Sequence, residues 1–332
     1  MKVGEKMIHI IKSKTLKLSH KNAAIKKLYI YGNRLKISLL SFVSDETFAK
    51  IKYKESTGKT LNLKNPTTFN EKLWWLKLNN RDPLLTLCTD KYKVRDYVKK
   101  CGLGHILITL YGVYNDAKDI NFDTLPDKAF IKTNHGSGTN IIWDRSRPFN
   151  ISKFKKEFNK ALRRNYFWQS REWNYKNIEP KIIIEEVLEN EEKSPLVDYR
   201  FLCFDGAVKL IFVDIETASS DGSHNPYAKR NVYDKNFNYL DIKVGREHFN
   251  PSLVKKPCNL DEMIRYAEIL SNPFPHCRID LYNIDGKVYF GEITFYHGGC
   301  SQIITPGEWD KRIGDWINLG SSKIKLNSSI NE

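Results

Sequence analysis

Helical patterns recur along the chain and are separated by short β-rich runs. Apolar residues follow a helical spacing over residues 45–57, 67–78, 89–98, 149–166, 261–270 and 309–319. Gly58 is a predicted stop for the first of these helices. Thr67 or Thr68, followed by Glu71, predicts a capping box at the start of the second, and Pro83 is expected to end that helix.

The β-rich runs predict several strands and at least two hairpins. They cover residues 106–113, 128–143, 180–188, 198–213 and 278–294. Two of these runs contain Asp-Gly at their centre, which is a strong signal for a hairpin turn. The mixture of helical and β-rich segments predicts an α+β (α/β) fold.

The last hairpin carries a concentration of charged side chains. Because alternate residues of a strand share a face, Arg278, Asp280 and Tyr282 are expected on one side of the first strand. Glu292 and Thr294 share one side of the second. Two acids and an arginine on one stiff hairpin predict a Mg²⁺ and phosphate site, since Mg²⁺ prefers carboxylates completed by phosphates and water. A solvated surface hairpin is the alternative.

The length of the hairpin loop decides whether the two carboxylates can meet. A three-residue loop over 284–286, with Gly286 left-handed, would bring the faces of Asp280 and Glu292 together. A two-residue Asp-Gly loop would place them on opposite faces. We therefore expect the longer loop if both carboxylates bind one ion.

A glycine-containing loop lies between two predicted strands at residues 128–143. Gly136-Ser137-Gly138 can direct backbone N–H groups into an anion-binding concavity, and Lys132 adds a mobile cation. The spacing differs from that of a P-loop, and a plain hairpin turn with a surface lysine is the alternative. His135 and His297 lack partners at metal-ligand spacing, so neither is assigned to a metal.

The segment 170–175, Ser-Arg-Glu-Trp-Asn-Tyr, is aromatic and charged. It fits either a packed corner or part of a substrate cleft, and its composition favours the corner.

Composition and charge limit the class of protein. The 332 residues are 41% hydrophobic and 12% aromatic, which is typical of a globular protein. The formal charge of +15, from 54 basic and 39 acidic residues, indicates an anionic partner such as a nucleotide, nucleic acid, acidic glycan or membrane surface. Six scattered cysteines without a Cys-x-x-Cys pair suggest reduced thiols in a cytoplasmic protein. No apolar run approaches the ~20 residues needed to span a bilayer, and no signal-peptide pattern is present.

The first 40 residues are strongly basic. They contain ten Lys or Arg against one acid, Glu5, with apolar residues interleaved. A basic amphipathic helix of this kind can lie on an anionic membrane, which would place the protein at the inner face of the cell membrane. An ordinary solvated helical extension is the alternative.

The order of the charged residues resembles that of ATP-grasp enzymes. The residues concerned are Lys91, Lys132 with its glycine loop, 185–188, Asp198, Arg278, Asp280 and Glu292. Four stretches of sequence are similar to those of the TupA-like ATP-grasp branch, which is named for teichuronopeptide biosynthesis. They are residues 68–78, 132–138, 170–180 and 291–295. The resemblance covers roughly residues 60 to 310. It implies an ATP-grasp fold, with two α+β subdomains clasping ATP.

The resemblance also implies nucleotide contacts. Lys91 and Lys132 would hold the ATP phosphates, with Gly136-Ser137-Gly138 folding over them. Glu185 and the backbone of Leu188 would meet the adenine. The ribose would meet Asp198, and Arg230 is a further candidate for a phosphate contact.

The metal and catalytic roles follow from the same resemblance. Asp280 and Glu292 would ligate Mg²⁺, Arg278 would face the reacting carboxylate, and Lys132 would neutralise phosphate charge during transfer. Thr294 stands where many relatives carry a metal-ligating Asn. A hydroxyl is a poorer Mg²⁺ ligand, which puts a second metal position in question.

The resemblance further implies a division of the chain. A basic helical N-terminal extension would occupy residues 1–60, and an N-terminal part of the ATP-grasp region residues 61–125. The nucleotide-binding and catalytic core would occupy residues 126–320, and a loose tail residues 321–332.

Three functions are compared. The first is an ATP-dependent carboxylate–amine ligase that acts on a cell-surface polysaccharide or its precursor, with an acidic glycan or other carboxylate acceptor and an amine donor. The second is a glycosyltransferase of the same pathway, although the Asp-x-Asp signature of one such class is absent from the sequence. The third is a basic binding module for nucleic acid or membrane. Nucleic acid is not expected, because no recognition motif is evident.

Overall fold

Two units divide the chain in this computed structural model, residues 1–61 and residues 62–332. The structure describes residues 32, 40–192, 195–219 and 221–326. In the first unit, α3 (Asp45–Thr57) begins after Ser44 and ends at Gly58, which is left-handed and donates its N–H to Lys54 O. The predicted stop is therefore confirmed. The basic amphipathic segment lies outside the described residues apart from Gly32 and Leu40.

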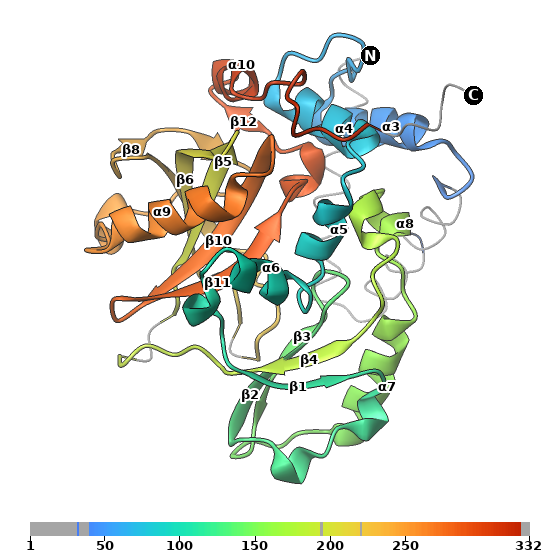
Figure 1. Cartoon of the computed structure of the whole chain (residues 1–332), viewed down its shortest axis with the longest axis vertical. Coiled ribbons are helices and arrows are strands. Elements are labelled where there is room, and N and C mark those ends of the chain that lie inside the picture. Colours follow the sequence, from blue (N-terminus) through green and yellow to red (C-terminus); the bar gives the residue numbers. More distant parts are fainter. Residues whose placement is uncertain (1–31, 33–39, 193–194, 220, 327–332) are drawn as a thin grey trace. The chain divides into compact units, whose positions relative to one another are not determined.

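The larger sheet of the second unit has six antiparallel strands in the order β11-β10-β5-β6-β7-β8 (Figure 1). The strands are β5 (Asp198–Phe204), β6 (Ala207–Ile215), β7 (Lys229–Asp234), β8 (Tyr239–Leu240), β10 (His276–Ile284) and β11 (Lys287–Thr294). Helix α9 (Leu260–Ser271) packs across β5, β6 and β10. Buried apolar residues such as Phe201 alternate with charged residues such as Arg200, so the face opposite α9 carries the charged side chains.

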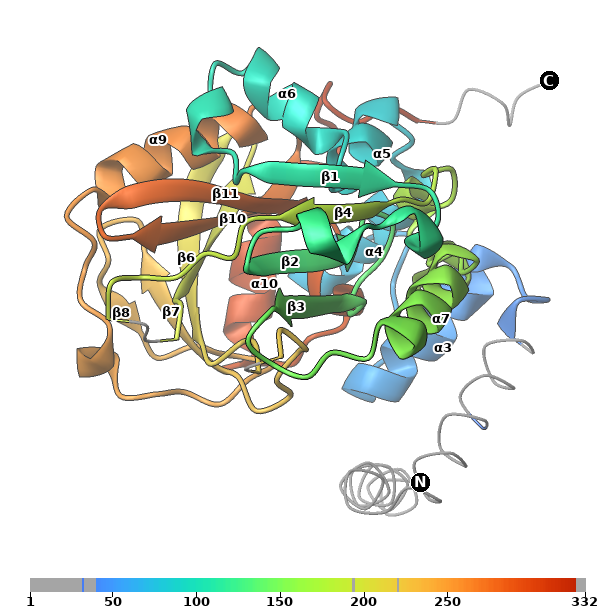
Figure 2. The ribbon, with the colours of Figure 1, turned by 90° about the horizontal axis from the view of Figure 1, so that it is seen from below.

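The smaller sheet has four strands in the order β1-β4-β2-β3, which lie side by side in Figure 2. The strands are β1 (Leu110–Tyr114), β2 (Lys128–Thr133), β3 (Asn140–Asp144) and β4 (Ile182–Glu185). An aromatic and aliphatic core joins one face to α7 (Ile151–Leu162) through Ile131, Trp143, Phe154 and Phe158. The strand, glycine loop and strand predicted over 128–143 are confirmed.

Short helices and a small two-stranded sheet complete the second unit. They are α4 (Phe69–Asn79), α5 (Pro83–Thr89), α6 (Val94–Lys100), α8 (Phe167–Ser170), α10 (Glu308–Asp315), β9 (Lys243–Val244) and β12 (Ile304–Thr305). The 3₁₀ turns are η1 (Gly104–Ile106), η2 (Ala117–Asp119), η3 (Phe122–Thr124), η4 (Trp173–Tyr175), η5 (Pro251–Leu253) and η6 (His297–Cys300). The capping box of α4 is confirmed, with Thr68 as the N-cap and Glu71 bonding back to it.

Some boundaries differ from the sequence predictions. Pro83 follows the end of α4 and is also the first residue of α5, which Asp82 caps. Proline fits this first position because its missing N–H would have no partner within the helix. The strand predicted from residue 106 begins at Leu110, after the 3₁₀ turn η1. Within the segment expected to be a tail, Lys325 exchanges hydrogen bonds with residues 80 and 81, and residues 327–332 lie outside the described residues.

A loop of the larger sheet is bonded to the edge of the smaller one. The N–H of Ile142 donates to Asp221 O at 2.9 Å, and the amide of Asn140 donates to Gly222 O. At the start of the same loop, the Thr217 hydroxyl donates to Asp198 Oδ2 at 2.5 Å. The loop between β6 and β7 thus joins β3 to β5.

Within the described ranges, no helix has both the length and the apolar character required to cross a membrane.

Candidate functional site

The β10–β11 hairpin brings the two predicted carboxylates together by a route that the sequence did not reveal. Ile284 pairs with Lys287, so the loop contains two residues, Asp285 and Gly286, both with positive φ (50° and 83°). The three-residue loop expected from the sequence is therefore wrong. A two-residue loop alone would separate the two acidic faces, so a second irregularity has to restore them.

That irregularity is a bulge at Gly291. Asp280 pairs with Glu292 and Leu281 pairs with Phe290, which leaves Gly291 as one extra residue in β11. The extra residue returns Glu292 to the face of Asp280. A Cβ atom at position 291 would lie 3.0 Å from Asp280 O, so the close approach of the strands favours glycine.

Arg278 holds the carboxylate pair in one orientation. Its Nε and Nη2 donate to the two oxygens of Asp280 at 2.6 Å each, and Nη2 also lies 3.2 Å from Glu292 Oε1. The Thr294 hydroxyl donates to Glu292 Oε1 at 3.0 Å. Arg278 and Thr294 therefore form one cluster with the two carboxylates.

The two carboxylates differ in their electrostatic surroundings. Burial raises the pKa of Asp280 above its ordinary value, although Arg278 and Arg200 act in the opposite direction. Burial also acts to raise the pKa of Glu292, but Lys91 and the two guanidiniums outweigh it and hold that pKa at about 2. Glu292 is the more accessible of the two, with 38% of its side chain exposed. At neutral pH it is an ionised carboxylate facing the interior of the site.

An arginine network beside this cluster was not identified from the sequence. Arg200 on β5 pairs across the strands with Asp280, and its Nε lies 3.1 Å from Asp214 on β6. Asp214 is fully buried and also accepts bonds from Arg230, at 2.6 and 2.7 Å, and from Arg246 at 2.6 Å. One signal was present in the sequence, because Asp214 interrupts the apolar run from Leu210 to Ile215.

The network holds the guanidinium groups of Arg230 and Arg246 against Asp214. Two nitrogens of the buried Arg230 are bound to Asp214, and Nη1 donates to Val244 O at 3.5 Å. Burial lowers the pKa of Arg246 to about 10, Asp214 opposes that change, and Arg230 adds to it. Because three guanidiniums surround Asp214, this carboxylate keeps a pKa below its ordinary value despite complete burial.

Lys91 connects the glycine loop to the carboxylate pair. Its Nζ donates to Gly136 O at 3.0 Å and lies 3.6 Å from Glu292 Oε2. The buried Asn134 fixes the base of the loop, because it bonds to Asp90 and to the backbone of Lys181. Lys91, proposed from the sequence as a phosphate ligand, is thus directed at the predicted metal site.

Lys132 lies on the face of the smaller sheet away from α7. Its Nζ lies 2.6 Å from Glu185 Oε2, and Arg95 from α6 lies 3.3 Å from the other oxygen. Glu185 is therefore ion-paired, and Leu188 follows it in the segment that leads to the larger sheet. In the glycine loop between β2 and β3, Ser137 and Gly138 are exposed, and Gly138 has a φ of 80°.

The corner at residues 170–175 is packed and also lies near the charged cluster. Arg171, Glu172 and Asn174 are all buried, as the composition favoured. Burial raises the pKa of Glu172, against the influence of Lys77, and Glu292 adds to the increase.

The pair Asp280 and Glu292 fits a magnesium ion chemically. Each carboxylate oxygen has two acceptor positions, so oxygens that already accept from Arg278 keep capacity for a cation. Mg²⁺ is commonly held by one or two carboxylates with substrate phosphates and water. Among the described residues, no group of three or more His, Cys, Asp or Glu side chains is placed to hold a metal ion.

Two facing sheets, a glycine loop over one and clustered acids and cations on the other, define an ATP-grasp fold. The chain belongs to the TupA-like ATP-grasp family, because the profile of that family, described as TupA-like ATPgrasp, matches residues 71–318. The resemblance noted in the sequence is therefore confirmed. A comparison with curated proteins gives no match.

Solved structures give distant similarities. D-alanine–D-alanine ligase from Bacillus anthracis, complexed with ATP, is 16% identical, with 64% of this chain and 57% of that chain covered and a TM-score of 0.36. Biotin carboxylase from Campylobacter jejuni is 11% identical, with coverage of 75% and 51% and a TM-score of 0.40. Phosphoribosylamine–glycine ligase from Thermotoga maritima is 14% identical, with coverage of 65% and 49% and a TM-score of 0.39. The matched part thus spans about half to three fifths of those proteins.

Proposed function

We propose that this protein is an ATP-dependent carboxylate–amine ligase that modifies a cell-surface polysaccharide or its precursor, for instance by joining an amino acid to a uronic acid. The observation that carries the proposal is the cluster of Asp280, Glu292 and Arg278 with Lys91 directed at it. Family membership supports ATP as the cosubstrate, and the TupA-like branch suggests the glycan.

The nucleotide would lie between the two sheets. In the proposal, Lys91 and Lys132 hold the phosphates and Gly136-Ser137-Gly138 closes over them. The proposal also assigns Glu185 and the backbone of Leu188 to the adenine, Asp198 to the ribose and Arg230 to a phosphate.

Phosphoryl transfer is the first chemical step. An acceptor carboxylate attacks the γ-phosphorus of ATP, the bond to the bridging oxygen breaks, and an acyl phosphate and ADP result. Lys132 and Lys91 neutralise the phosphate charge and hold the groups in line. When bound at Asp280 and Glu292, Mg²⁺ would supply further charge stabilisation.

Amide formation is the second step. The amine attacks the acyl carbon, a tetrahedral oxyanion forms, and the C–O bond to phosphate breaks as the amine loses a proton. Arg278 and N–H groups near Gly298 and Gly299, both left-handed with φ of 61° and 62°, are suited to stabilise the oxyanion. Loss of one such donor typically costs about 3 kcal/mol of transition-state stabilisation.

Calorimetric titration with a non-hydrolysable ATP analogue and Mg²⁺ tests the nucleotide site. Lys132→Met and Glu292→Gln are expected to weaken binding at least about tenfold, because each removes a charge from the phosphate or metal region. Lys128→Met and Glu189→Gln are matched controls, because Lys128 lies on the same strand as Lys132 and pairs with Glu189 at the surface, 2.6 Å away. No binding by folded wild-type protein would contradict the nucleotide site.

An acceptor screen then tests the reaction. Phosphate release that requires both a uronic acid acceptor and an amino acid is the expected result. Preferential binding of nucleotide sugars over ATP would instead favour a glycosyltransferase.

A further inference from the structure

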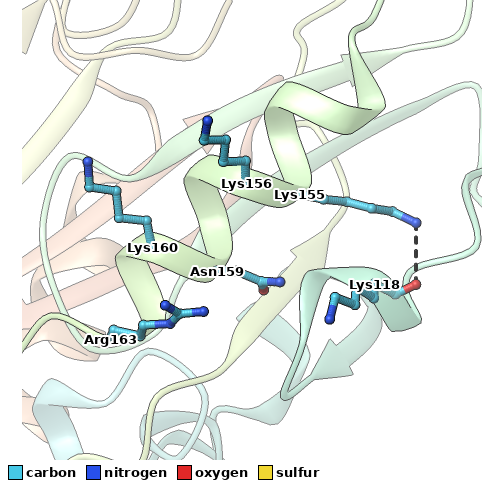
Figure 3. Close-up of a pocket in the computed structure, with 6 residues that line it drawn as sticks. All are labelled: Lys118, Lys155, Lys156, Asn159, Lys160 and Arg163. Atoms are coloured by element: carbon cyan, nitrogen blue, oxygen red, sulfur yellow. Dashed lines mark hydrogen bonds between the residues drawn. The ribbon is translucent and has the colours of Figure 1, made fainter.

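A basic pocket lies on the smaller sheet's outer layer, between α7 and η2 (Figure 3). It has a volume of about 480 Å³ and is lined by Lys118, Lys155, Lys156, Asn159, Lys160 and Arg163. Figure 3 shows Lys156 and Lys160 extending from one side of α7, while Lys155 extends toward Lys118. Five of the six lining residues are cationic and none is acidic.

The sequence of α7 explains why Lys156 and Lys160 share a face. Phe154, Phe158 and Ala161 are buried against the smaller sheet, so Lys156 and Lys160 lie on the exposed side of the helix. Lys156 and Lys160 are four residues apart and therefore lie one turn apart on the same side. Like charges at this spacing repel each other, which indicates that the surface is suited to hold a counter-charge rather than to stabilise the helix alone.

Among the described residues, the cations of the pocket lack ion-pair contacts, although Asp116 lies near enough to Lys118 and Arg163 for both to lower its pKa. Within the described part of the chain, none of the five forms an ion pair; Lys155 donates only to the backbone oxygen of Lys118, at 3.3 Å. Asn159 is bound to the Ala117 N–H and to Asp116, so it positions η2 against the helix. Glu157 is the one acid in the sequence of α7 and does not line the pocket.

The pocket adjoins the glycine loop. At the end of α7, Ala161 O lies 3.2 Å from His135 Nε2, and His135 directly precedes the loop. A Cβ atom on Gly136 would lie 3.7 Å from the ring of Tyr166, which follows α7. A polymer bound along α7, which is about 18 Å long at 1.5 Å per residue, would therefore approach the loop that covers the proposed nucleotide site.

We propose that this basic pocket docks a polysaccharide with repeated carboxylate groups, and that it delivers the acceptor of the proposed ligase to the site. The inference rests on the proposed function for the identity of the acceptor. The lining itself argues against nucleic acid and against a lipid surface as the partner. It contains no aromatic side chain on which nucleic-acid bases could stack and no apolar side chain that could enter a lipid layer.

A binding experiment with polygalacturonate tests the proposal without requiring catalysis. The full-length wild type is expected to bind polygalacturonate but not neutral dextran, with weaker binding at higher salt. The variant Lys156→Gln, Lys160→Gln, Arg163→Gln is expected to bind on the order of tenfold more weakly, as three surface charge contacts are lost. Glutamine has a helix propensity close to that of lysine, so α7 should remain folded.

A matched variant separates the pocket from general charge. Lys209→Gln, Lys255→Gln, Lys256→Gln removes three charges from other exposed lysines and is expected to leave the affinity within about twofold. Equal losses in both variants, or no binding by the wild type, would overturn the proposal. Tighter binding of a single-stranded oligonucleotide of equal charge, or of vesicles containing phosphatidylglycerol, would also overturn it.

Parallel titration with the ATP analogue distinguishes the two proposals. Normal nucleotide binding without polygalacturonate binding would reject the docking surface alone. Polygalacturonate binding by the pocket without nucleotide binding would retain the docking surface and reject the ligase. In the ligase reaction, the pocket variant is expected to raise KM for the polymer while KM for a monomeric uronic acid stays unchanged.

Discussion

Asp280 lies directly opposite Glu292 because Gly291 adds one residue to β11. Without that residue, the two-residue turn at Asp285 and Gly286 would place the carboxylates on opposite faces of the hairpin. The spacing of the proposed metal ligands therefore depends on a backbone irregularity outside the turn.

Gly291→Ala is expected to disturb this pairing. The added methyl group would approach the Asp280 carbonyl oxygen at 3.0 Å, so the strands must shift. We expect Mg²⁺-dependent nucleotide affinity to fall at least about tenfold, measured by calorimetry. Gly286→Ala is the control, since it has open space but a left-handed φ; it should cost about 1 kcal/mol of stability and leave the affinity intact. Equal affinities in the two variants would show that the bulge does not position the ligands.

Thr294 offers a test of the second metal position. Thr294→Asn places a carbonyl oxygen, a better Mg²⁺ ligand than a hydroxyl, beside Glu292 Oε1. The Mg²⁺ concentration at half-maximal nucleotide binding is expected to fall several-fold. Thr294→Val removes the hydroxyl and should raise that concentration. A higher requirement in the Asn variant would argue that the position has no contact with metal.

Asp214 is predicted to be essential for stability. Asp214→Asn removes the charge that compensates Arg200, Arg230 and Arg246 in a buried site, and breaking such an arrangement typically costs about 3–5 kcal/mol. Urea unfolding should show a loss of that order. Asp241→Asn, at a carboxylate that is 89% exposed, should change the stability by less than about 0.5 kcal/mol. Similar stabilities for the two variants would contradict the role assigned to the network.

A buried histidine pair predicts a loss of stability in mild acid. Burial lowers the pKa of His276 to about 3 and the pKa of His297 well below its ordinary value, and their Nε2 atoms lie 3.4 Å apart. Below pH ~6.5 the unfolded chain takes up protons that the folded chain does not, so stability falls as the pH decreases. His276 should contribute about 2 kcal/mol of loss between pH 7 and pH 5, and His297 should add a loss of the same sign.

Unfolding free energies at the two pH values test this prediction. In His276→Gln, the difference in unfolding free energy between pH 7 and pH 5 should be smaller by the contribution of His276. His248→Gln, in the surface loop after β9, should leave that difference unchanged. The comparison uses differences within each variant, so a general destabilisation by the substitution does not obscure it. An unchanged difference in His276→Gln would refute the assignment.

Short-range signals in the sequence predicted much of the fold. The capping box of Thr68 and Glu71 and the stop at Gly58 depend on neighbouring residues and were found where expected. The two Asp-Gly hairpins were also predicted, because left-handed turn residues are chemically distinctive.

Long-range pairing limited the prediction of the site. Strand alternation correctly placed Asp280 on the same face as Arg278. The location of the bulge depends on the close approach of two backbones, and its only trace in the sequence is Gly291. Arg200 and Asp214 meet because β5 and β6 pair in one register. Alternation along a single sequence predicts the face of a residue only where the strand is regular, and it does not give the partner across the sheet.

The bonds of Ile142 and Asn140 to residues 221 and 222 have a mechanical consequence. If the smaller sheet rotates to admit a nucleotide, it must either break these bonds or pull the β6–β7 loop along. Pulling that loop displaces Thr217, whose hydroxyl holds Asp198. In the second case, a rotation of one sheet would be transmitted to a side chain on the other, because Asp198 would follow the loop.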